Sequence, residues 1–141
     1  MMSRRLFDLW IDNRVIMARV RGSWDDQIAK EFATAFRALG EQLYSTPPGH
    51  WAHIVYLDDW QLGTPDIEPI VIELVNWAIT HGLTRTAQVY SPSMLKQFQM
   101  DRMVEDHRED FIRRIYPNER DAFAWLDSEG YAVTKSTLEI N

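Results

Sequence analysis

One apolar stretch in the middle of the chain limits the possible folds more than any other feature. Residues 51–57 read Trp-Ala-His-Ile-Val-Tyr-Leu and are nearly all apolar. A short continuous run of this kind is typical of a strand that is buried on both faces. We therefore predict a central strand here, with Asp58 and Asp59 at its carboxyl end.

Further strand-forming runs alternate with helix-forming segments along the chain. Residues 6–11 and 15–20 are β-rich and are joined by turn residues, which predicts an N-terminal hairpin. Residues 86–90 and 111–116 supply two more strands. Capping residues and prolines mark four helix starts, at Ser23, Thr64-Pro65, Ser91-Pro92 and Pro117-Asn118.

The predicted order of elements is ββαβαβαβα, with about four helices. Right-handed crossovers then give one mostly parallel sheet of about five strands, in which an N-terminal hairpin strand is antiparallel. The fold class is α/β. We expect a single domain over residues 1–127, followed by a C-terminal tail at residues 128–141 that is either an edge strand or disordered. Apolar residues in the tail are too sparse to decide between these two states.

Composition removes several classes of function. The chain of 141 residues has no cysteine, which excludes disulfides, thiolate zinc sites and thiol nucleophiles. A formal net charge of -6 opposes binding to a nucleic-acid backbone. We find no signal peptide, no transmembrane segment and no Gly-rich phosphate loop. A cytoplasmic protein without a cofactor is the expectation.

The segment that follows the central strand is the candidate ligand or partner site. Open α/β sheets place their ligand crevices at the carboxyl ends of strands. The site residues are Asp58, Asp59, Trp60 and Thr64.

Two enzymatic alternatives use the same acidic pair. Asp58 or Asp59 could act as a general base with His53 nearby. They could also hold a divalent cation together with Asp66 and Glu68. The spacing supports neither arrangement, so we assign no catalytic and no metal-ligating residue.

The second predicted helix has an apolar face that covers more than half of its circumference. One apolar stripe runs along it, and Ile72, Trp77 and Ile79 widen that stripe on both sides. A helix that packs only on its own sheet needs a narrower face. The additional contact is therefore a neighbouring helix of the same domain, a second subunit or an apolar ligand. We predict a homodimer with Ile72, Trp77 and Ile79 at the interface.

Several short motifs occur in an order and spacing that resemble a known family. They are Gly22-Ser23-Trp24-Asp25, Val55-Tyr56-Leu57-Asp58-Asp59-Trp60, Trp77-Ala78 with His81-Gly82-Leu83, and Ala122-Phe123-Ala124-Trp125-Leu126. Together they resemble the STAS-like domains and, more narrowly, bacterial proteins related to the stage II sporulation anti-anti-sigma factor, the SpoIIAA-like proteins. The similarity spans roughly residues 6–127.

The resemblance implies a small non-enzymatic module with a regulatory role. Signalling members of the family carry a phosphorylatable serine in an Asp-Ser-Ser-Gly segment after the central strand. This chain lacks that segment, and Thr64 is the only hydroxyl residue between Asp59 and Asp66. Thr64 is thus a weak phosphoacceptor candidate, and its alternative role is an ordinary helix cap.

The leading hypothesis is a STAS-like protein-interaction or regulatory module whose partner the sequence does not identify. One alternative is a protein that binds a lipid or another small apolar ligand between the second helix and the sheet. The other is an acid-base or metal-dependent enzyme at Asp58 and Asp59.

Overall fold

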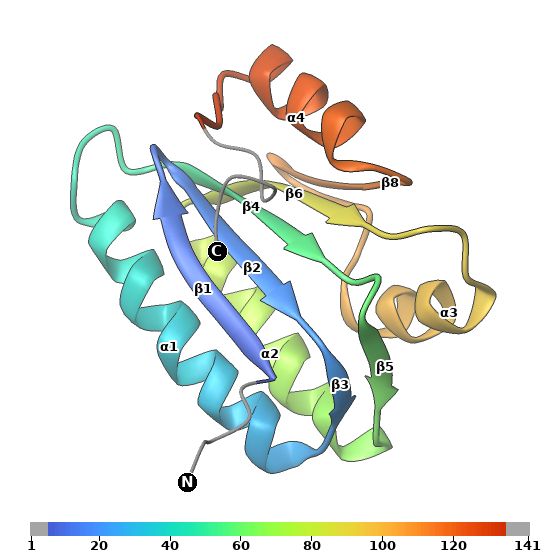
Figure 1. Ribbon diagram of the computed structural model, residues 1–141. Helices are drawn as coiled ribbons and strands as arrows, with labels where there is room; N and C mark the ends of the chain where they lie inside the picture. The colour runs from blue at the N-terminus through green and yellow to red at the C-terminus, as the bar shows by residue number, and fades with distance from the viewer. Residues whose placement is uncertain (1–5, 135–141) are drawn as a thin grey trace, which may run out of the picture.

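The structure is a computed structural model that describes residues 6–134. Its centre is a six-stranded sheet with the strand order β1-β2-β4-β6-β8-β7 (Figure 1). Neighbouring strands from β2 to β8 are parallel, and the edge strands β1 and β7 are antiparallel to their neighbours. The strands of this sheet are β1 (Phe7–Asp12), β2 (Val15–Val20), β4 (Trp51–Tyr56), β6 (Leu83–Val89), β7 (His107–Arg108) and β8 (Phe111–Tyr116).

Four α-helices cover the two faces of this sheet. One face packs against α1, α2 and α3, and the other packs against α4 (Figure 1). The helices are α1 (Asp26–Tyr44), α2 (Glu68–Thr80), α3 (Met94–Met103) and α4 (Glu119–Ser128), with a short 3-10 helix η1 (Pro65–Ile67) before α2. The α/β class, the mostly parallel sheet, the antiparallel hairpin and the central strand are confirmed.

Three short strands were not predicted. Strands β3 (Gly22–Trp24) and β5 (Trp60–Gly63) pair with each other in a separate small parallel sheet, and β7 extends one edge of the main sheet. Segments of two to four residues are too short to carry a periodic pattern of apolar side chains.

Two of the predicted helix caps are wrong by two residues. Ser23 lies in β3, and Asp25 caps α1 by accepting a hydrogen bond from the Ile28 amide at 3.0 Å. Likewise Ser93, and not Ser91, caps α3 and accepts from the Lys96 amide at 3.2 Å. In both cases a second capping residue just downstream caps the helix, because Ser23 is taken up by β3 and the Ser91 amide bonds to the Asp58 carboxylate.

The C-terminal part of the described chain adds to the core under α4. Tyr131 is buried with Trp125 and Leu126 of α4, beyond the boundary predicted at residue 127. The Thr134 amide then donates to the Asp12 carboxylate at 3.0 Å. Residues 129–134 form no strand, and residues 135–141 of the predicted tail lie outside the described part. Among residues 6–134, no helix has the length and apolar character needed to cross a membrane.

Candidate functional site

The acidic loop after β4 is held against α3. Asp58 and Asp59 are both exposed. The Asp58 carboxylate accepts a hydrogen bond from the Ser91 amide at 2.8 Å, just before α3. The Lys96 ammonium group on α3 donates to the backbone oxygens of Leu57 at 2.7 Å and Asp58 at 2.8 Å. The loop and the N-terminal end of α3 therefore form one continuous surface.

The other two predicted site residues lie in different environments. Trp60 is buried and lines an apolar cavity below the loop. Thr64 is exposed at the start of η1, where its hydroxyl donates to the Asp66 carboxylate and caps no backbone amide. The structure thus places Asp58, Asp59 and Thr64 on the surface and Trp60 in the interior.

Helix α3 presents three large apolar side chains to solvent beside this loop. The side chains of Met94, Leu95 and Phe98 are 90%, 67% and 64% exposed. Apolar side chains of this size that gather on one exposed helix face are typical of interaction sites. This surface could not be predicted from the sequence pattern, because α3 has almost no amphipathic pattern, and the run of apolar residues was the only available signal.

Polar contacts also fix α3 to β5 and α2. The Gln99 side chain accepts from the Gly63 amide at 2.9 Å and donates to the Gly63 oxygen at 3.0 Å. The Arg102 guanidinium donates to the Glu68 carboxylate at 3.0 Å, and this bond raises the pKa of Arg102. Glu68 therefore serves an ion pair, and within residues 6–134 no group of three or more acidic or histidine side chains could hold a metal ion.

His53, which the enzymatic alternative pairs with the acidic residues, lies inside the domain. Its ring packs edge-on against Phe36 with 4.9 Å between ring centroids. Its Nδ1 atom lies 2.9 Å from the backbone oxygen of Ile16. Burial lowers the pKa of His53 to about 4. His53 shares no hydrogen bond with either exposed aspartate in the described part of the chain, so the structure contains no acid-base pair at this loop.

An apolar cavity of about 100 Å³ lies between the sheet and the three helices on this face. Aromatic residues of α1, aliphatic residues of α2 and methionines of α3 form its walls. Three polar side chains contribute to its floor on β4 and β6, namely His53, Thr86 and Gln88.

An ionic cluster around the buried Arg113 borders the cavity under α3, and its carboxylates, Asp101 and Asp106, reach the surface. The Arg113 side chain is only 2% exposed and donates to Gln88 at 2.8 Å, Asp101 at 2.6 Å and Asp106 at 2.7 Å. The hydroxyl of Tyr90 is buried without a partner in the described structure, and burial raises its pKa. This cluster was not predicted from the sequence.

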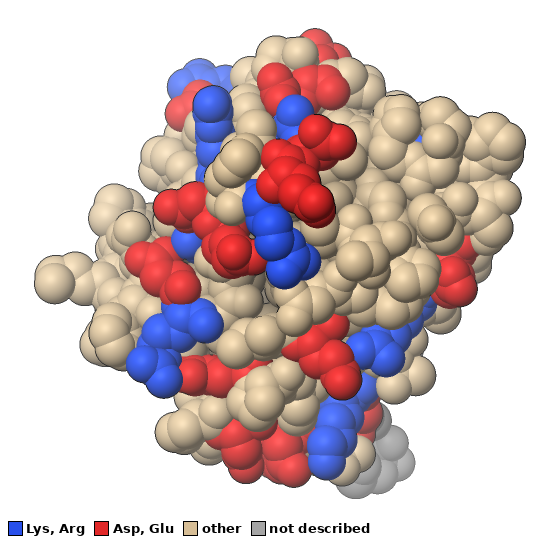
Figure 2. Space-filling model, turned by 180° about the vertical axis from the view of Figure 1, so that it is seen from behind, with Lys and Arg blue, Asp and Glu red and all other residues tan. Residues whose placement is uncertain are grey.

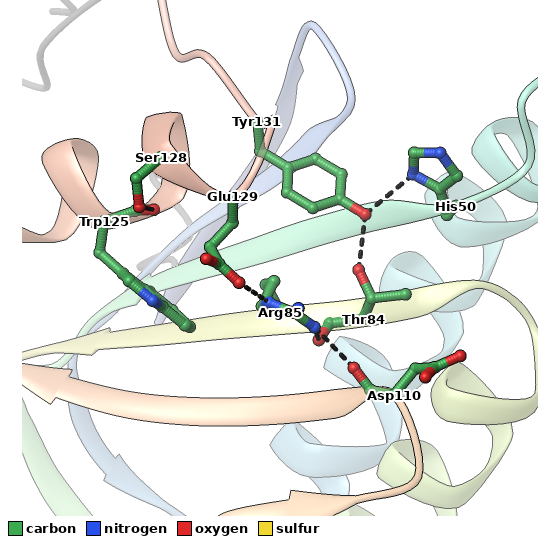
Figure 3. Close-up of polar contacts among 8 residues, drawn as sticks. All are labelled: His50, Thr84, Arg85, Asp110, Trp125, Ser128, Glu129 and Tyr131. Carbon is green, nitrogen blue, oxygen red and sulfur yellow. Dashed lines mark hydrogen bonds and ion pairs between the residues drawn. The ribbon is translucent and has the colours of Figure 1, made fainter.

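A third polar cluster lies at the amino ends of the strands, away from the acidic loop. Tyr131 points its hydroxyl between His50, at 2.9 Å from Nδ1, and Thr84, at 2.5 Å (Figure 3). Arg85 joins Glu129 and the backbone oxygen of Asp110 (Figure 3). These bonds hold the segment after α4 on the sheet, so we assign the cluster a structural role.

The three predicted interface residues on α2 differ in exposure. Ile72 is 38% exposed. Trp77 stacks on His81 and lies so close to α1 that a Cβ added at Gly40 would be 3.0 Å from its ring. Ile79 is partly buried against the core. Helix α2 lies between α1 and α3, which accounts for much of its wide apolar face within one chain.

The arrangement of the sheet and helices defines an α/β fold of the SpoIIAA-like class, as the motifs predicted. A protein of the DUF3478 family from Shewanella loihica PV-4, described as uncharacterized with a SpoIIAA-like fold, is similar over 89% of this chain and 99% of its own, with a TM-score of 0.64 and 12% identity. The anti-sigma factor antagonist SpoIIAA in its unphosphorylated form is similar over 88% of this chain and 98% of its own, with a TM-score of 0.53 and 16% identity.

The Bacillus cell fate determinant SpoIIAA in the phosphorylated form is similar over 85% of this chain and 98% of its own, with a TM-score of 0.54 and 16% identity. No protein-family model matches the chain, and no curated protein matches it. At these identities the likeness establishes the fold.

Proposed function

We propose that this chain is a non-enzymatic regulatory module that works by binding a protein partner. The observation that carries the proposal is the exposed apolar side of α3, which lies beside the acidic loop. The likeness of the fold to an anti-sigma factor antagonist supports a regulatory role. A cytoplasmic location is part of the proposal.

The proposed docking surface, which we name the α3 surface, consists of Met94, Leu95 and Phe98 together with Asp58 and Asp59. Its apolar part would be costly to leave in water unless a partner covers it. The bonds of Lys96 and Gln99 hold α3 in place, so the surface is formed before the partner binds. A preformed surface loses little conformational entropy on binding.

Charge indicates the chemistry of the partner. The whole chain carries a net charge of -6, and acidic and basic side chains are interspersed over the face that carries α1 and α2 (Figure 2). The Asp58 carboxylate accepts from the Ser91 amide just before α3, and Asp59 follows it in the same exposed loop. The partner is therefore expected to present an apolar patch with lysine or arginine at its rim.

Two substitutions that introduce a negative charge on α3 test this proposal. A photo-crosslinking amino acid at position 95 first captures the partner, which is then purified for affinity measurements. Leu95→Asp and Phe98→Asp are each expected to weaken its binding at least about 30-fold, because a charge would replace a central apolar contact. Gln97→Asp is the matched control on an exposed position of the same helix. Equal affinities for all three variants would contradict the α3 surface.

Phosphorylation of Thr64 stays a proposal. Its hydroxyl is exposed and accessible, but Asp66 and the nearby Glu68 would repel an added phosphate. The intact mass of the protein, purified from the cells that naturally make it, tests this idea, and a population without added phosphate under all growth conditions would argue against it.

Homodimerisation also stays a proposal, now supported chiefly by the exposure of Ile72. Light scattering of the wild type at micromolar concentration is expected to give the mass of a dimer, and Ile72→Lys is expected to give a monomer. Thr80→Lys, on another exposed position of α2, adds the same single charge and is the control. A monomeric wild type would rule out this interface.

The apolar cavity favours a second candidate function, the binding of a small apolar ligand. Its volume of about 100 Å³ and its apolar walls are suited to an uncharged molecule. Native mass spectrometry of the purified protein tests this function. A bound apolar molecule would support it, and a bare chain that also takes up no added apolar compound would contradict it.

A further inference from the structure

The floor of the apolar cavity contains two buried polar side chains that lie side by side on neighbouring strands. His53 on β4 and Thr86 on β6 are Cα partners in the parallel register. Both are buried, and both line the cavity. Two polar groups side by side in an otherwise apolar cavity are costly unless they form hydrogen bonds.

The hydrogen bond to Ile16 determines which nitrogen of His53 carries the proton. A backbone oxygen can only accept, so Nδ1, at 2.9 Å from the Ile16 oxygen, is the protonated nitrogen. The ring is neutral because burial disfavours its charged form. Nε2 therefore presents a lone pair, and no donor within residues 6–134 reaches it.

Thr86 is in the same position, with its hydroxyl making no hydrogen bond in the described part of the chain. Gln88, the third polar side chain of the floor, is already engaged. Its oxygen accepts from Arg113 at 2.8 Å, and its amide nitrogen lies 3.5 Å from the sulfur of Met100. The cavity thus offers one free acceptor, one free hydroxyl and no charged side chain.

We propose that this cavity binds a small neutral molecule with an apolar body and one hydroxyl group, which donates to Nε2 of His53 and contacts the hydroxyl of Thr86. The inference rests on the cavity-binding function proposed above and names its ligand class. An ionised carboxylate or ammonium group is excluded, because the cavity provides no opposite charge to offset its desolvation.

The volume limits the size of the molecule. An engineered apolar cavity of roughly 150 Å³ binds benzene, so about 100 Å³ accommodates at most a single ring once the walls adjust slightly. Met100 and Met103 form part of the α3 wall, and methionine side chains adapt readily to the shape of a neighbour. The expected ligands are phenols and short branched alcohols.

Phenol and toluene form a matched pair of probes, because they share a shape and differ by a hydroxyl in place of a methyl group. Calorimetric titration of the full chain at neutral pH is expected to show that phenol binds at least about 10-fold more tightly than toluene, which corresponds to one hydrogen bond to a buried acceptor. Benzoate, the charged analogue, is expected not to bind.

Two variants locate the hydrogen bond within the cavity. His53→Leu removes the acceptor and is expected to bring the preference for phenol below about 3-fold while toluene still binds. Thr86→Val keeps the shape of the side chain and is expected to weaken phenol several-fold without changing toluene. If His53→Leu does not fold, the affinities of Thr86→Val and the ratio of the wild-type affinities for phenol and toluene still test the proposal.

The outcomes separate this inference from the function on which it rests. Equal binding of phenol and toluene by the wild type would overturn hydroxyl recognition and leave apolar binding intact. The same preference for phenol in both variants would also overturn it, since the hydroxyl would then bind elsewhere. Failure of the wild type to bind either compound would contradict the cavity function itself.

Discussion

Acidification from about pH 6.5 to about pH 4 is expected to lower the unfolding free energy by about 3 kcal/mol through one side chain, His53. Burial lowers the pKa of His53 from 6.5 to about 4 in the folded protein. In this pH range the unfolded chain takes up a proton on the histidine, whereas the folded chain does not. Stability is therefore unaffected by His53 above this range, falls as pH drops through it, and does not fall further from this cause below it.

Urea unfolding at several pH values measures this loss. In His53→Gln the part of the pH dependence that belongs to His53 should disappear, whatever the carboxylates contribute. His107→Gln is the matched control, because the side chain of His107 is exposed on β7. An identical pH profile for wild type and His53→Gln would show that this ring is not shielded from water.

Removal of both carboxylates that contact Arg113 is expected to have the second large effect on the unfolding free energy. The double variant Asp101→Ala with Asp106→Ala is expected to lose about 3 kcal/mol of unfolding free energy, because it leaves a buried guanidinium without a countercharge. Adding Arg113→Met to this double variant removes the buried charge. The triple variant is therefore expected to regain at least about 1 kcal/mol relative to the double variant.

Glu105→Ala provides the control for the loss of a carboxylate in the same segment. Its side chain is 55% exposed and pairs with Arg108 at the surface, so the expected change is within about 0.5 kcal/mol. A triple variant less stable than the double variant would mean that the guanidinium contributes packing rather than an uncompensated charge.

The main elements of the fold could be predicted because long patterns in the sequence determine them. The apolar run at residues 51–57 indicated a central strand, and helical spacing indicated α1 and α2. Strands β3 and β5 could not be found in this way. They pair with each other, and what stabilises them is contact between segments far apart in the chain.

The candidate site was predicted only in part, for reasons that concern single residues. Asp58 and Asp59 were placed correctly at the end of β4, but burial of Trp60 depends on the path of β5. Arg113 could have been suspected, because Phe111, Arg113 and Ile115 alternate along a strand that is covered on both faces. Successive residues of a strand point to opposite faces, so Arg113 must share the face of Phe111 and Ile115, which packs against the larger core.

The exposed side chains of α3 could not be predicted from the sequence for a different reason. A helix with little amphipathic pattern gives no indication of which side will face the sheet. Here Gln99 and Met100 turn inward, and the contacts of Gln99 with Gly63 orient the helix. Only with that orientation fixed do Leu95 and Phe98 become a surface.

Hydrogen exchange of the chain with and without its purified, crosslink-identified partner tests the central claim most directly. The account predicts slower exchange of backbone amides in residues 91–98 and in the loop at residues 58–64 when the partner is bound. Protection confined to α1 or α4, with the α3 surface exchanging as in the free chain, would contradict it.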